Sequence, residues 1–205
     1  MTIQKQQSLG LGGVASATVA IILSSSLILY PEPTSENILT ALRVSSVTTA
    51  VPFLLVFAAR PLAMLSLSRE LGQWAQANRR YLWFILTISH LLHLYQITLY
   101  YQLGQSCPFI VWAITAPLWI IMVLFSLVEG VNPHLFDRLY QGRGNLGIKV
   151  LHGLGSGYVW LVFTLAFGLG VFDKHLLFYN VPALASFLAG AFLCGITWWW
   201  RRAIA

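Results

Sequence analysis

The chain has 205 residues, of which 58% are hydrophobic and only 9% are charged, and its mean hydropathy is +0.74. A soluble globular domain carries about 25% charged residues, so this composition excludes that class and predicts an integral membrane protein. Two cysteines are too few for a disulfide framework.

Six apolar segments are each close to the roughly 20 residues that a helix needs to cross about 30 Å of hydrocarbon. The predicted spans are 12–30, 46–67, 81–103, 108–128, 148–171 and 178–200. We interpret the first as a true span rather than a cleaved signal peptide, because no small-x-small cleavage site follows it. We therefore expect an all-α polytopic membrane protein, with residues 1–205 forming a single six-helix transmembrane domain.

The positive charges predict the orientation of these spans. If the spans alternate in direction, ten of the twelve Lys and Arg residues lie on one side, and Arg43 and Lys174 lie on the other. The positive-inside rule places the cation-rich side, and with it both termini, in the cytoplasm. The net charge of +6 therefore reflects topology in a lipid bilayer, and no nucleic-acid partner is expected.

Three histidines are the strongest functional signal. His90 and His93 lie deep in the third predicted span, three residues apart and so on one face of a helix. His152 lies near the start of the fifth span. Ionisable side chains in hydrocarbon usually have a function, and histidines on separate membrane helices can hold a haem iron. The alternative is that they form hydrogen bonds between helices.

The depths of the three histidines differ. At a rise of 1.5 Å per residue, His152 is expected to lie about 8 Å shallower in the membrane than His90 and about 12 Å shallower than His93. On depth alone, His90 and His152 are therefore the easier pair to bring to one haem iron. The glycines that follow His152, at positions 153, 155 and 157, would either let a flat macrocycle approach the backbone or pack against another helix.

Arg60 lies near the end of the second span and is followed by Pro61, which is expected to kink or end that helix. An arginine there can pair with a haem propionate, because its planar guanidinium suits a carboxylate. It can equally reach the lipid interface. Arg79 and Arg80 are interpreted as topology anchors rather than propionate ligands.

Several short motifs occur together in the order of a known family. They are Phe57-Ala-Ala-Arg-Pro-Leu62, Asn78-Arg-Arg-Tyr-Leu82 and Ser89-His-Leu-Leu-His-Leu94. With them, residues 44–171 resemble the ferric reductase-like transmembrane domain family, which includes the haem-binding membrane subunit of the periplasmic methionine sulfoxide reductase system. That family has a histidine thirteen residues after the Arg-Arg pair, here His93, and a Leu-His near the start of the fifth span, here Leu151-His152. The resemblance implies a bundle that holds b-type haem and carries electrons across a bacterial inner membrane.

The sequence departs from this family at one position. Many members have a second histidine thirteen residues after the first one in the fifth span, where this chain has Leu165. We therefore expect one haem b, with the iron bound by His152 and by either His93, from the family pattern, or His90, from depth.

The electron partners implied by the resemblance are separate molecules. Larger members append flavin and nicotinamide domains, whereas this chain ends at Ala205. We expect the donor to be a separate reductase or quinol, with FMN or quinone reached through that partner, and the acceptor to be a partner protein or ferric iron. The chain would then be an oxidoreductase component without its own flavin or nicotinamide domain.

Two other functions remain open from the sequence. A haem-free assembly or interaction protein would use its buried histidines as structural contacts. A small proton-coupled transporter would use His90 and His93 as a relay. The lack of an acidic residue within the predicted spans argues against transport.

Overall fold

The computed structural model describes residues 8–64, 68–106, 108–132, 135, 145–172 and 177–204, without the side chains of residue 177 and of 201–204. Its helices are α1 (Gly10–Leu29), α2 (Ser35–Met64), α3 (Arg69–Ala77), α4 (Arg79–Gln102), α5 (Phe109–Val131), α7 (Leu146–Gly170) and α8 (Leu177–Ile204). Six of these are long and apolar enough to cross a membrane. The prediction of an all-α bundle with six spans is confirmed.

One span begins much earlier than its hydropathy indicates. The second predicted span starts at residue 46, but α2 starts at Ser35, where the hydroxyl of Thr34 accepts a hydrogen bond from the backbone N–H of Asn37. Polar residues in the first turns hide this start from a hydropathy window. The expectation that Pro61 could end the helix is wrong, because α2 continues to Met64.

The connection predicted between the second and third spans contains the short helix α3, which packs against the last turns of α2. A Cβ placed on Gly72 would lie 2.0 Å from the backbone nitrogen of Ala63, so only glycine permits this approach. Asn78 follows α3, and its side-chain oxygen accepts a hydrogen bond from the Leu9 backbone at 2.6 Å. The α3 end of the bundle thus holds the starts of α1 and α4.

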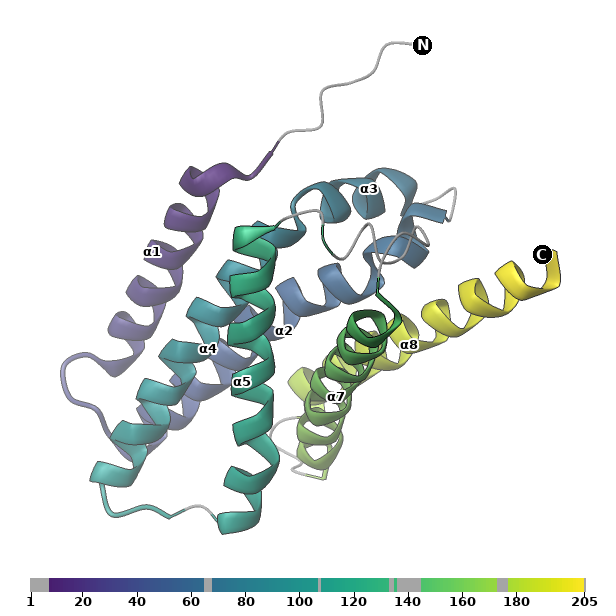
Figure 1. Cartoon of the computed structure of the whole chain (residues 1–205). Coiled ribbons are helices and arrows are strands. Elements are labelled where there is room, and N and C mark those ends of the chain that lie inside the picture. The colour runs from purple at the N-terminus through teal and green to yellow at the C-terminus, as the bar shows by residue number, and fades with distance from the viewer. Residues whose placement is uncertain are drawn as a thin grey trace.

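Five helices form a closed ring through their main contacts, in the order α2, α4, α5, α7 and α8, with α8 returning to α2. Helix α1 packs outside this ring, against α2 and α4 (Figure 1). Aromatic side chains fill the interior and pack on one another, face to face or edge to face, namely Phe53, Trp83, Phe125, Phe163 and Phe187. Helices α4 and α7, which carry the three candidate histidines, therefore lie on opposite sides of an aromatic core.

Hydroxyl and amide side chains join α2 to α4. Thr48 and Thr49 both hydrogen-bond to Ser89, at 2.6 and 3.0 Å. Ser45 hydrogen-bonds to Gln96 at 2.7 Å. Such bonds hold membrane helices together where burial of apolar surface gives little driving force.

The contact of α3 with α2 predicts that alanine substitution destabilises the protein at Gly72 but not at Gly157. Gly72→Ala should lower the free energy of unfolding by about 1–3 kcal/mol, because the added methyl group overlaps backbone. Gly157→Ala is the matched control, since a Cβ there meets nothing within 4 Å. Denaturant unfolding of the detergent-purified protein measures both, and an equal effect of the two substitutions would contradict this close packing.

Candidate functional site

His90 lies in the interior of the helix ring and is 6% exposed. Its ring stacks on Trp119 of α5, with the centroids 3.9 Å apart, and lies 6.2 Å from the ring of Phe163 of α7. Both ring nitrogens are buried, and neither has a hydrogen-bond partner within the described part of the chain. Leaving a buried polar group unsatisfied costs about 1–3 kcal/mol, so this arrangement requires an explanation.

His93 lies alongside His90 but is bonded differently. The two rings are nearly parallel, at an angle of 4° and a centroid distance of 5.4 Å. Nδ1 of His93 lies 2.7 Å from Oγ of Ser45, which itself hydrogen-bonds to Gln96. Gln96 in turn donates to Ser25 of α1 at 2.8 Å. His93 is therefore part of a polar network between α1, α2 and α4.

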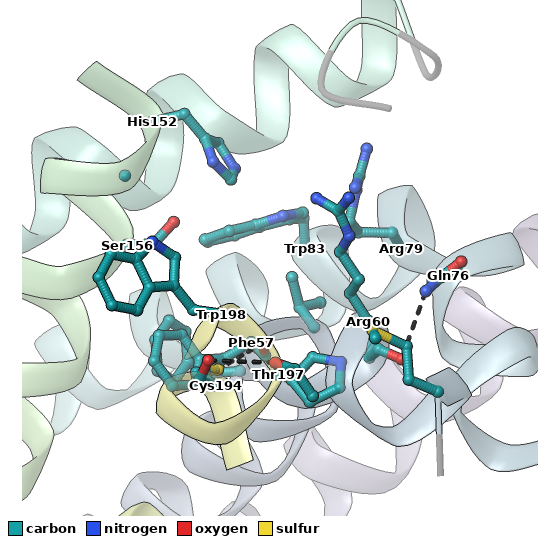
Figure 2. Close-up of a pocket in the computed structure, with 16 residues that line it drawn as sticks. Phe57, Arg60, Gln76, Arg79, Trp83, His152, Ser156, Cys194, Thr197 and Trp198 are labelled. Carbon is teal, nitrogen blue, oxygen red and sulfur yellow. Dashed lines mark hydrogen bonds between the residues drawn. The ribbon is translucent and has the colours of Figure 1, made fainter. Parts of the chain in front are cut away.

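His152 lies on α7, stacked on Phe125 of α5 with the ring centroids 5.0 Å apart. It lines a cavity of about 440 Å³, together with residues of α2, α3, α4 and α8. Figure 2 shows the His152 ring and the Arg60 side chain reaching into this cavity from opposite sides. The volume falls within the range of about 300–1,000 Å³ that is usual for small-molecule sites.

The four predicted site residues form two groups. His90 and His93 contact each other, and His152 and Arg60 line one cavity. Phe125, beneath His152, packs on Trp83, which precedes His90 by seven residues, or about 10 Å along α4. His152 thus lies nearer the α3 end of the bundle than His90 does.

The glycines that follow His152 do not all have the same role. A Cβ on Gly155 would lie 2.6 Å from the ring of Phe125, so this glycine lets α7 approach α5 closely. A Cβ on Gly153 or Gly157 would meet nothing within 4 Å. Gly155 therefore packs α7 against the ring on which His152 stacks.

Arg79 and Glu129 form a buried ion pair that the sequence interpretation missed. Nε of Arg79 lies 2.6 Å from a carboxylate oxygen of Glu129, whose side chain is 0% exposed. Glu129 belongs to α5 rather than to the connection after it, and Arg79 points inward rather than serving as a surface anchor. Arg80, in contrast, lies over the ring of Tyr81, 4.4 Å from its centroid.

The inward position of Glu129 could have been inferred from two features of the sequence. The glutamate directly follows an apolar run of span length, and Arg79 begins the neighbouring span of the same hairpin. Trp119, Ser45 and Gln96 gave no comparable signal. Their roles depend on which faces of different helices meet.

No protein-family model, curated protein or solved structure matches this chain. The resemblance to the ferric reductase-like family therefore rests on the short motifs alone.

The ion pair predicts a strong and specific effect on stability. Glu129→Leu should lower the free energy of unfolding by about 3–5 kcal/mol, because it leaves the Arg79 charge without its carboxylate in an apolar environment. The double variant Arg79→Met, Glu129→Leu should recover most of this loss. Unfolding in mixed micelles measures the free energy of unfolding of both variants. The control is Glu70→Leu, because Glu70 is an exposed residue of α3.

A double variant as unstable as Glu129→Leu alone would contradict the pairing. So would a similar loss in Glu70→Leu, since Glu70 is exposed.

Proposed function

We propose that this chain binds one b-type haem inside the helix ring and relays electrons across a bacterial inner membrane, with both termini in the cytoplasm. The observation that carries the proposal is His90, a buried histidine whose ring nitrogens have no hydrogen-bond partner within the described residues. It lies on α4, across the aromatic core from the helix that carries His152. Coordination of iron is a natural use for such a nitrogen.

The chemistry of the described residues fits a haem. Imidazoles project from two helices on opposite sides of one core, so that His152 and either His93 or His90 would hold the iron. The cavity beside His152 offers space, and Arg60 lines it with a guanidinium suited to a propionate. Trp83 and Phe125 lie between His152 and the α4 histidines, so their rings must shift to admit a macrocycle.

Held by two of these histidines, the iron would supply one-electron transfer rather than oxygen chemistry. The residues of this chain would hold the ligands and exclude water with the aromatic core. The α3 end, where Arg60, Arg79 and the cavity lie, would face a separate cytoplasmic reductase with FMN, or a quinol. The acceptor at the other end would be a partner protein or ferric iron. The chain would serve as an oxidoreductase component.

A proton-coupled transporter is the second candidate, because one observation favours it. Glu129 is buried in a membrane-spanning helix, which removes the sequence argument that no acidic residue lies within the spans. Its carboxylate and the two α4 histidines are the kinds of groups found in proton relays. A haem-free protein with proton-dependent uptake of a solute would support this function instead.

The haem proposal predicts a spectrum. The dithionite-reduced minus oxidised absorption spectrum of the purified protein should show sharp b-type bands, at about one haem per chain. His152→Ala should abolish the six-coordinate low-spin spectrum, because one axial ligand is removed. Variants of His134 and His175, which lie outside the predicted spans and outside the described residues, are controls of the same residue type and should keep it.

A colourless protein after expression with added haem would refute the haem proposal. Normal bands in His152→Ala would instead refute the role given to His152.

A further inference from the structure

The two histidines of α4 lie one turn apart but face different parts of the bundle. His90 contacts Trp119 of α5 and Phe163 of α7, so it faces the interior of the helix ring. His93 contacts Ser45 of α2, on the side of the bundle where α1 also packs. The difference decides which of them is available to a ligand placed between α4 and α7.

The hydrogen bonds of Ser45 favour one tautomer of His93, the one with the proton on Nδ1. Oγ of Ser45 carries one hydrogen and lies 2.7 Å from Oε1 of Gln96 and 3.0 Å from the carbonyl oxygen of Leu42, both of which can only accept. All of these contacts are hydrogen bonds when the hydroxyl of Ser45 donates to Gln96 or Leu42 and Nδ1–H of His93 donates to Oγ of Ser45.

The same network fixes the direction of the His93 ring. Gln96 is fully buried and is held in turn by its bond to Ser25 of α1. Turning the His93 ring toward α7 would break the bond to Ser45 and leave the buried hydroxyl of Ser45 with one partner fewer. That loss opposes any rotation of His93 into the ring interior.

His90 has no such restraint from hydrogen bonds. In a neutral imidazole one nitrogen carries a hydrogen and the other a lone pair, and both nitrogens of His90 are buried without a hydrogen-bond partner among the described residues. The ring is instead oriented by packing. Its centroid lies 3.9 Å from that of the Trp119 ring and 5.4 Å from that of the parallel His93 ring. A bond from the lone pair to a metal would satisfy one of the two nitrogens.

We propose that His90, rather than His93, is the α4 ligand of the haem iron. His93 is then a positioning residue, which Ser45 and Gln96 hold beside His90 so that it limits rotation of the ligand ring. The assignment rests on the proposed haem function, and it differs from the family pattern, which favours His93.

The first experiment compares spectra of variants of the full chain. His90→Gly should lose the six-coordinate low-spin spectrum, and added imidazole should restore it by occupying the vacated ligand position. His93→Gly should keep a low-spin spectrum with a shifted midpoint potential, and imidazole should not change it. Ser45→Ala should shift the potential in the same direction as His93→Gly, because both release the same restraint.

The second experiment uses protein from haem-deficient cells and needs no cofactor. His90→Leu should raise the thermal midpoint of the haem-free protein by about 2–4 °C, because it removes an unsatisfied buried polar side chain. His93→Leu should lower the midpoint, because it breaks the bond to Ser45. These shifts also show whether the two leucine variants fold, and the thermal midpoints of His90→Gly, His93→Gly and Ser45→Ala are measured in the same way.

Each outcome bears on a different statement. A wild-type protein without haem overturns the proposed function, and this assignment with it. A wild-type protein with haem overturns the assignment alone if His93→Gly loses the low-spin spectrum, whether or not His90→Gly also loses it. A haem-free His90→Leu protein less stable than the wild type would likewise contradict the assignment.

Discussion

The absence of water from the hydrocarbon region is the constraint on which this structure depends. Backbone groups meet it by forming helices, and side chains meet it by bonding to other helices. Ser45, Thr49 and Ser89 join α2 to α4, and Arg79 and Glu129 join α4 to α5. On α8, the hydroxyl of Tyr179 donates to the Arg43 carbonyl of α2 at 2.8 Å. Polar contacts therefore link α4 to both of its neighbours in the ring and α8 to α2.

His90 is a buried polar side chain that forms no hydrogen bond to another helix within the described residues. It lies in the ring interior among aromatic side chains rather than in the polar network one turn away. An aromatic core suits a flat, largely apolar cofactor and excludes water from it. A histidine that merely joined helices would be expected to bond as His93 does.

The two ends of the bundle differ in charge and in shape. Among the described side chains, Arg60, Arg69, Arg79, Arg80 and Lys149 lie at the α3 end, whereas Arg43 lies nearer the other end. The cavity lined by His152 and Arg60 also lies at the α3 end. This end thus combines positive charge with a concave surface, an arrangement that attracts anionic groups.

The sequence by itself determined the fold class and the number of membrane-spanning helices, because hydropathy over about 20 residues reflects the thickness of the membrane. It also placed His90 and His93 next to each other on one helix, because that follows from their spacing, but the tertiary structure turned His90 to the ring interior and His93 to α2. The sequence missed the first turns of α2, the helix α3 and the inward position of Glu129. Only the tertiary structure paired Ser45 with His93 and Arg79 with Glu129, across 48 and 50 residues of sequence. Such pairs depend on which helix faces meet, and hydropathy carries no information about a partner so distant in the chain.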